Sequence, residues 1–273
     1  MPKQTKIRCS GLPHYSDCPR KAAAKLLLAE LVEDGYQLHT LKTSVGAAVG
    51  TATHAGIETA LLLRQEGKDY EKELEEVATL SIESSIENGV LWDLTTPTKD
   101  IAIKQAIRQA KSVVNNFPDL TGVDIEEEYK ADLGDNFILS GHIDIRHGDA
   151  IFDIKTGATR RANQAQYGGY SLLCRSNGKI IKRLGEIYVP RIGITKPQPE
   201  PQFVEYDVKD AERLAWDIIQ QIKKDILSYR ENKSARTWLA NPNSMMCNPD
   251  YCPAYKTNFC NCQIGDIKND RRN

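Results

Sequence analysis

The spacing of apolar residues changes near Gly122 and divides the chain into a helical part and a strand-rich part. Before that point apolar residues recur every three to four positions, which predicts helices at about 19–33, 46–67, 69–89 and 98–117. After it the period becomes two, which predicts strands at about 124–133, 136–146, 150–156, 182–190 and 202–208. Helical spacing returns at about 163–176 and 209–231. This order favours an α/β fold with a mixed central sheet flanked by helices.

The pattern indicates one domain over residues 1–273 rather than two independent ones. Within it we expect a mainly helical N-terminal portion at 1–120, an α/β core at 121–235 and a cysteine-rich tail at 236–273. Hydrophobic residues make up 40% and charged residues 27%, as in soluble globular proteins. The formal net charge of −1 gives no global argument for a polyanionic partner, although a local basic groove would suffice to bind one.

Neither a membrane span nor a signal peptide is expected. No apolar run approaches the roughly 18–20 residues that a membrane helix needs. The N-terminal stretch MPKQTKIRCSGLPHYSDCPRK contains no apolar segment of the kind that a signal peptide requires. We therefore expect a cytoplasmic protein.

Two aspartates lie nine positions apart in the stretch GHIDIRHGDAIFDIKTG, residues 141–157. The pair Gly148-Asp149 predicts a type II′ turn, which places Asp144 directly opposite Asp153 on neighbouring strands. Alternation then puts Lys155 on the face of the two aspartates. The opposite, apolar face would carry Ile143, Ile145, Phe152 and Ile154.

Like charges that face each other across two strands are destabilising unless something neutralises them. A shared proton or a divalent cation would do so, and hard carboxylate oxygens suit Mg²⁺ or Mn²⁺. Lys155 is then placed to orient a water nucleophile or to stabilise a developing oxyanion. The alternative is a solvated hairpin in which Asp144 pairs with Lys155 or an arginine.

The order Asp144 … Asp153-x-Lys155 resembles the core motif of the PD-(D/E)XK nuclease superfamily. Gln166-x-x-x-Tyr170 in QYGGY, a histidine in GTATHAG and the entry SGLPHYSDCPRKAAAK extend the resemblance to RecB-like exonucleases of the phage-type and CRISPR-associated groups. The second acid is aspartate where that family more often has glutamate. The resemblance implies a restriction-endonuclease-like core.

The resemblance also implies roles for single residues. His54, Asp144, Asp153 and the Ile154 carbonyl match metal ligands, and Lys155 matches the catalytic lysine. Gln166 and Tyr170 match residues that support the active site and the DNA. An upstream acid is expected to assist, and the choice is open among Glu126, Glu127 and Glu128.

The function that the resemblance implies is that of a Mg²⁺- or Mn²⁺-dependent deoxyribonuclease, an exonuclease acting in DNA end processing, recombination and repair, or in phage DNA metabolism. Its partner would be DNA, as ends or single strands, in a prokaryotic or phage-infected cytoplasm. Two alternatives stay open: a structure-specific endonuclease, and a non-catalytic DNA-binding adaptor that keeps the fold. A homo-oligomer and a recombination-protein partner are also left open.

Four of the seven cysteines fall in the C-terminal run Cys247-x₄-Cys252-x₇-Cys260-x-Cys262. Thiols at this density indicate a soft metal, either zinc or an iron–sulfur cluster. The resemblance implies a [4Fe–4S] cluster held by Cys18, Cys247, Cys252 and Cys260, with Cys262 as the alternative fourth ligand and zinc as the alternative metal. Cys9 is a weaker candidate ligand, and Cys174 is expected in the core.

Three arginines are candidates for contact with DNA phosphates. Arg160 and Arg161 fall in the loop after the D-x-K strand, beside the predicted active face. Arg20 lies in the CPRK stretch at the start of a predicted helix. The alternative for the two loop arginines is an ordinary solvated loop.

Overall fold

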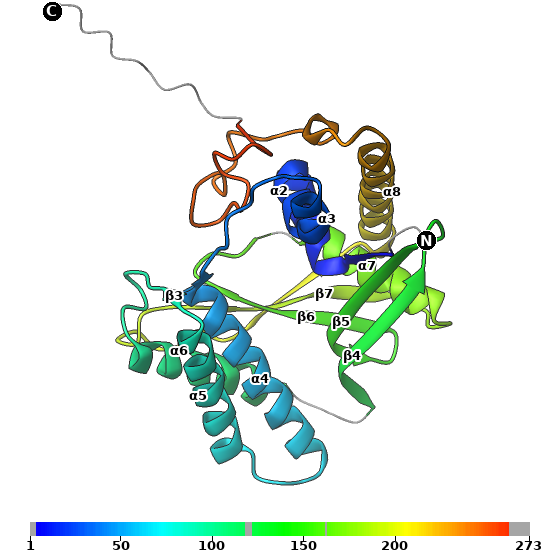
Figure 1. Ribbon diagram of the computed structural model, residues 1–273. Helices are drawn as coiled ribbons and strands as arrows, with labels where there is room; N and C mark the ends of the chain where they lie inside the picture. Colours follow the sequence, from blue (N-terminus) through cyan, green and yellow to red (C-terminus); the bar gives the residue numbers. More distant parts are fainter. Residues whose placement is uncertain (1–3, 118–121, 162, 262–273) are drawn as a thin grey trace, which may run out of the picture. The chain divides into compact units, whose positions relative to one another are not determined.

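The computed structural model describes residues 4–117, 122–161 and 163–261 (Figure 1). Among the described residues, those within 1–9 and 42–216 form one compact unit, the sheet unit, and those within 10–41 and 217–273 form a second, the cysteine unit. Among the described residues, none of the helices combines the length and the apolar character needed to cross a bilayer.

The sheet unit is built on a six-stranded mixed sheet in the order β1-β5-β6-β7-β8, with β4 also paired to β5. The strands are β1 Thr5–Arg8, β4 Val123–Asp132, β5 Phe137–His147, β6 Ala150–Gly157, β7 Arg183–Pro190 and β8 Gln202–Tyr206. The β6–β7 pair is parallel, and the β4–β5 and β7–β8 pairs are antiparallel. A small parallel pair, β2 Thr43–Ser44 and β3 Val90–Leu91, lies apart from this sheet. The four-residue strand β1 is an element that the apolar periodicity did not predict.

Strand β5 has two partners on one of its edges. β4 pairs along residues 138–147 of β5 and so occupies the first edge. On the second edge β1 pairs with residues 137–140, and β6 pairs with residues 145–147. Within the described chain, residues 141–144 therefore have no strand partner on that edge. The sheet forks at this point, and Asp144 lies in the fork.

The hairpin between β5 and β6 has the predicted register. His147 pairs with Ala150, and Ile145 pairs with Phe152. Gly148 has φ +59°, the positive value that the first position of a type II′ turn requires. The ladder ends at the Ile145–Phe152 pair, one step before the two aspartates.

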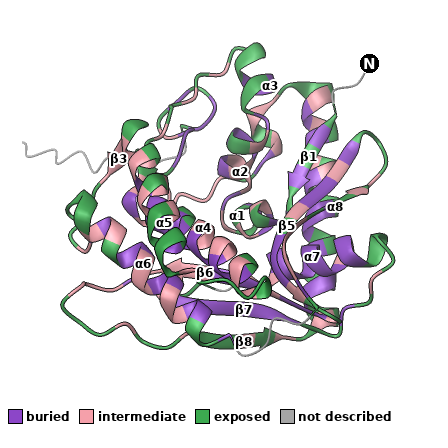
Figure 2. Ribbon diagram, turned by 90° about the horizontal axis from the view of Figure 1, so that it is seen from below, coloured by how far each residue is buried: buried purple, intermediate pink, exposed green. Residues whose placement is uncertain are grey.

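Two helices pack on one face of the sheet and a third packs against those two, and one helix covers the other face (Figure 1). The first group is α4 Val45–Gln65, α5 Glu71–Glu87 and α6 Lys99–Asn115, and the opposite helix is α7 Gln164–Ser176. The Ser44 hydroxyl caps α4 by accepting a hydrogen bond from the Ala47 N–H at 3.2 Å. Ile57, Leu61, Val113 and other residues of the first group form a buried core with Ile154 and Ile187 of the sheet. Buried residues accordingly follow the central strands (Figure 2).

The alternation of side chains breaks in the middle of β5. Ile145 packs into the core against α4 and α6, whereas an added side chain at Gly141 would meet Tyr170 of α7. Residues four apart on a regular strand share a face, so the strand changes face between these two positions. The expectation that side chains alternate regularly through Asp144 is therefore wrong, because the alternation is interrupted at the fork, between Gly141 and Ile145.

The cysteine unit consists of short helices and irregular chain. Its helices are α1 Leu12–Asp17, α2 Pro19–Leu26, α3 Leu28–Glu33, the part of α8 (Val208–Asn232) from Asp217 onwards, and the 3₁₀ turn Ala235–Thr237. The helix expected at 19–33 is broken at Leu27, which has non-helical φ −110° and ψ 23°. Aromatic contacts join Tyr36, Tyr229, Trp238 and Phe259 and give this unit its own apolar centre.

Candidate active site and thiol pocket

Three ligating side chains converge at the fork in the sheet. His54 of α4, Glu126 of β4 and Asp144 of β5 each offer an atom, and these atoms lie within 4.8 Å of one another. His54 Nδ1 is 3.5 Å from Asp144 Oδ2. The set brings together one nitrogen and two carboxylate groups, donors that divalent cations accept.

Glu126 is one of the three upstream acids, and its backbone is unusual. It has φ +52°, a left-handed conformation that is strained for a residue with a side chain. The flanking pairs Ile125–Ile145 and Glu127–Ile143 place it opposite Asp144, at the only step where the β4–β5 ladder lapses within the described register. The strained backbone thus turns the Glu126 carboxylate towards His54 and Asp144.

Asp144 is held from two directions. Its Oδ2 accepts a hydrogen bond of 2.6 Å from the Ile154 N–H, so the carboxylate occupies the gap where β5 and β6 separate. Burial raises the pKa of Asp144, but His54, Lys155 and the Ile154 N–H outweigh it and hold the pKa below its usual value. Asp144 is therefore ionised although its side chain is only 9% exposed.

Asp153 is held from the opposite face of the sheet. Its Oδ1 accepts a hydrogen bond of 2.9 Å from Gln166 Nε2 of α7, and the same nitrogen is 2.7 Å from the Tyr170 hydroxyl. Its Oδ2 lies 2.5 Å from Lys155 Nζ as an ion pair, but no hydrogen bond of good geometry reaches this enclosed oxygen within the described residues. Gly141 leaves room for the Tyr170 ring, since a Cβ there would come within 2.6 Å of it.

The carboxyl groups of Glu126 and Asp153 are costly to ionise in this site. Burial and Asp144 raise the pKa of Glu126 to about 7. Burial also raises the pKa of Asp153 to about 6, against the lowering influence of Lys155. Burial lowers the pKa of His54, but Asp144 and Asp153 outweigh it and raise this pKa to about 9. Carboxylates that are costly to ionise side by side are those that a bound cation stabilises most.

A further buried acid, Glu186 of β7, lies next to Asp153. The two residues are register partners in the parallel β6–β7 pair, and Glu186 is completely buried. It accepts a short hydrogen bond from the Tyr167 hydroxyl and pairs with Arg160 Nε at 2.5 Å. Sequence reasoning missed Glu186, although a single acid in the apolar strand LGEIYV was the signal that could have found it.

The two loop arginines differ in their surroundings. Arg160 is engaged by Glu186 and also donates from Nη2 to the Tyr206 hydroxyl at 3.1 Å. Arg161 is exposed, and its guanidinium has no ion pair among the described residues.

Comparison with solved structures finds a protein from Eubacterium rectale named "Putative exonuclease", with a TM-score of 0.51 at 13% sequence identity over 82% of this chain and 79% of that one. The chain shares its fold. The predicted α/β class, with a mixed central sheet flanked by helices, is confirmed. A second structure, of SSO0001, matches 81% of this chain and 78% of its own at 14% identity, with a TM-score of 0.33. No family model and no curated protein matches the chain.

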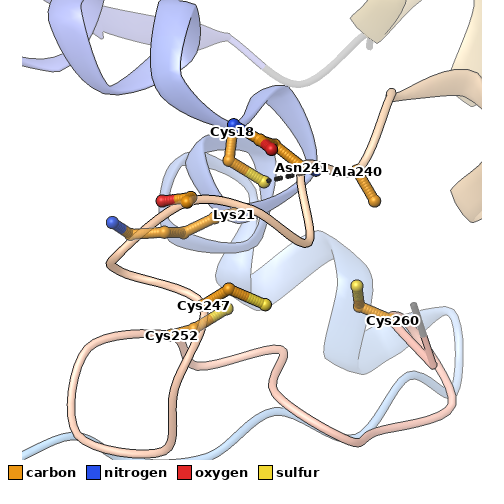
Figure 3. A pocket seen from close by; sticks show the side chains of 8 residues that line it. Cys18, Lys21, Ala240, Asn241, Cys247, Cys252 and Cys260 are labelled. Atoms are coloured by element: carbon orange, nitrogen blue, oxygen red, sulfur yellow. Dashed lines mark hydrogen bonds between the residues drawn. The ribbon is translucent and has the colours of Figure 1, made fainter. Parts of the chain in front are cut away.

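A pocket in the cysteine unit is lined by four thiols (Figure 3). Cys18 comes from the start of α2, and Cys247, Cys252 and Cys260 come from the irregular C-terminal chain. Cys18 Sγ accepts a hydrogen bond from the Asn241 N–H at 3.5 Å. The structure thus brings to one pocket the four cysteines singled out from the sequence, while Cys262 lies outside the described residues.

The other two cysteines lie elsewhere. Cys9 and Cys174 are both fully buried in the sheet unit, and Cys174 is in the core as expected. Burial raises the pKa of the Cys174 thiol to about 11, so this thiol is neutral. Neither residue lines the thiol pocket.

Proposed function

We propose that the chain is a divalent-metal-dependent deoxyribonuclease and, more narrowly, an exonuclease of the cytoplasm. The observation that carries this proposal is the convergence of His54, Glu126 and Asp144 at the fork, with Lys155 paired to Asp153 beside them. A partly buried set of this kind, on a fold that is shared with an exonuclease-named protein, supports a hydrolytic site.

The residues at the fork fit Mg²⁺ or Mn²⁺. The raised pKa values of Glu126 and Asp153 show that these carboxylates are costly to ionise side by side, which a bound cation would relieve. We assign His54, Glu126, Asp144, Asp153 and the Ile154 carbonyl as the ligands. When bound, such a cation supplies a nucleophilic water and neutralises charge on the scissile phosphate.

The remaining groups of the site hold this arrangement. Lys155 keeps its proton, because Asp153 outweighs the burial that lowers the pKa of Lys155. Its ammonium is placed to donate to the attacking water or to the phosphate oxygen as charge develops. Gln166 fixes the Asp153 carboxylate, and Tyr170 fixes Gln166. These two are positioning residues.

DNA contact is assigned first to Arg161. It is exposed and lies in the loop that follows the D-x-K strand, so its charge is available to a phosphate. Arg160 and Arg20 have guanidinium groups that already bind protein acceptors, and we assign them mainly to positioning. Direct DNA contact by Arg160 and Arg20 stays a prediction.

The experiment that tests this function uses full-length protein, Mn²⁺ and DNA labelled at its ends. We expect linear DNA to be degraded from its ends, closed circular DNA to survive, and Lys155→Ala to lose activity by about 100- to 1000-fold. Cleavage of the closed circle would establish the endonuclease alternative instead. Equal behaviour of wild type and Lys155→Ala would refute a nuclease centred on this lysine and would leave a DNA-binding role.

We further propose that the thiol pocket holds a [4Fe–4S] cluster through Cys18, Cys247, Cys252 and Cys260. Four thiolates around one zinc ion at about 2.3 Å would place their sulfurs about 3.8 Å apart. Among the described residues no three cysteines bring their sulfurs within 4.8 Å of one another, so the pocket is wider than a closed zinc site. Within this proposal, that spacing favours the cluster over a single zinc ion. Anaerobically purified protein should be brown and contain iron, whereas a colourless protein with stoichiometric zinc would reverse the assignment.

A further inference from the structure

Two consecutive cations, Arg20 and Lys21, follow Cys18 at the start of α2. Lys21 lines the thiol pocket and is only 2% exposed. Its Nζ is enclosed and has no hydrogen-bond partner in the described part of the chain. A buried ammonium without a partner is strongly unfavourable, so its place in this pocket needs an explanation.

The chain itself provides little compensation for the Lys21 charge. Burial is the main cause that lowers the pKa of Lys21, and nearby Lys25 lowers it further. Asp17 acts in the opposite direction, as do the pocket thiols Cys252 and Cys18. Figure 3 shows the Lys21 stem running along the pocket with its ammonium directed away from the sulfurs. Its effect on the pocket is therefore one of charge through a medium of low dielectric, not of a direct hydrogen bond.

Arg20 approaches the same thiols from a fixed position. Its Nε and Nη2 donate to the Trp238 carbonyl at 3.2 and 2.9 Å. Its Nη1 is then 4.0 Å from Cys260 Sγ, within reach of a weak hydrogen bond to sulfur. Both contacts lie within the cysteine unit. The guanidinium is thus turned to a thiol that the proposed cluster would use.

We infer that Arg20 and Lys21 are the counter-charge of a thiolate-bound iron–sulfur cluster in this pocket and that they raise its reduction potential. The inference rests on the cluster proposed above. Four thiolates give such a cluster a net negative charge, and reduction adds another. Nearby positive charge favours the reduced form, because net charge and hydrogen bonds to sulfur set the potential of these clusters.

The test compares Lys21→Met with Lys25→Met in anaerobically purified, full-length protein. Both substitutions remove one ammonium from α2, but Lys25 is exposed, so its charge is screened by water. Reductive titration followed by visible absorbance and electron paramagnetic resonance gives the midpoint potential. We expect Lys21→Met to lower the equilibrium constant for one-electron reduction at least tenfold, about 59 mV, and Lys25→Met to leave it unchanged.

Each outcome decides the matter. Equal potentials in Lys21→Met and Lys25→Met would overturn the inference while leaving the cluster in place. If Lys21→Met fails to retain iron, iron retention is measured on Lys21→Arg instead. Retention by Lys21→Arg supports the need for a charge, and loss of iron from both variants means that the lysine acts by its shape. If wild type itself holds no iron, the proposed cluster fails first, and with it this inference.

Discussion

The carboxylate site of the sheet unit and the thiol pocket of the cysteine unit each bring together side chains that are negative when deprotonated. The two sites differ in how positive charge reaches these side chains. In the first, helices and strands deliver His54, Lys155 and the Ile154 N–H to the acids. In the second, the start of α2 and the irregular C-terminal chain deliver the thiols, and the enclosed Lys21 ammonium lacks a partner among the described residues. In the carboxylate site the chain itself supplies part of the compensating positive charge. In the thiol pocket the enclosed cation has no such partner among the described residues, which fits the negatively charged cluster proposed above.

The largest expected effect is on catalysis, from Asp144→Asn. The substitution removes the charge that joins His54, Glu126 and the Ile154 N–H, so we expect DNA cleavage to fall by about 1000-fold and Mn²⁺ affinity to fall with it. Asp149→Asn makes the same change in the exposed turn of the same hairpin and serves as the control. End-labelled cleavage and calorimetric titration with Mn²⁺ measure the two effects. Equal activity in both variants would remove Asp144 from the site.

The second effect concerns the thiol pocket, through Cys252→Ser. We expect this variant to lose most of its iron and visible absorbance and to unfold at a lower temperature, because a pocket group that clamps irregular chain contributes to folding. Cys174→Ser changes a buried thiol outside the pocket and should keep its iron. Iron analysis and thermal unfolding monitor both variants. Iron loss from Cys174→Ser alone would contradict the assigned ligands.

A smaller effect is expected from Tyr167→Phe. This change removes a hydrogen bond to the fully buried Glu186 carboxylate and should lower the free energy of unfolding by about 1–3 kcal/mol. Tyr206→Phe removes a hydroxyl that contacts only Arg160 of the same network and should cost less. Urea denaturation compares them. A larger loss in Tyr206→Phe would show that Glu186 is not the centre of the network.

The smallest effect is a pH dependence at the Asp93–Arg191 ion pair of the sheet unit, whose Nη2–Oδ2 distance is 2.7 Å. Arg191 holds the pKa of Asp93 below its usual value of 3.8. A carboxylate whose pKa is lower in the folded chain than in the unfolded chain stabilises the folded state at pH values above its usual pKa. This contribution is lost as the pH falls through the pKa of the folded state. Asp93 is 41% exposed, so solvent screening limits the effect to below about 1 kcal/mol. The stability difference between wild type and Asp93→Asn should be constant at neutral pH and shrink below pH 3.8. An increase in this stability difference as the pH falls would contradict the prediction.

Local rules were sufficient to predict much of the sheet unit from the sequence. Gly148 fixes the turn and with it the register of the hairpin. The helices were recognisable because apolar residues keep one face of each towards the core. Strand β1 was not predicted, since four residues carry too little periodicity and their pairing with β5 is distant in the sequence.

The site was harder to predict where it depends on backbone conformation. The run Glu126-Glu127-Glu128 offers three equivalent acids, and only the left-handed backbone of Glu126 brings one of them to His54. Opposite Glu126, the regular alternation of side chains along β5 is also interrupted, and the period-two pattern of the sequence does not predict such an interruption. Arg20 and Arg160 appeared as available cations in the sequence, whereas their protein acceptors come from distant segments.

The shared edge of β5 has a consequence for how the chain can be handled. Strand β1, residues Thr5–Arg8, covers the first part of that edge, and β6 covers the last. Without β1, residues 137–140 would present unpaired backbone N–H and C=O groups in a mostly apolar strand. Such an edge is a template for pairing with a second chain. Removing these few N-terminal residues would therefore invite self-association and aggregation, and a purification tag is better placed where it leaves β1 free to pair.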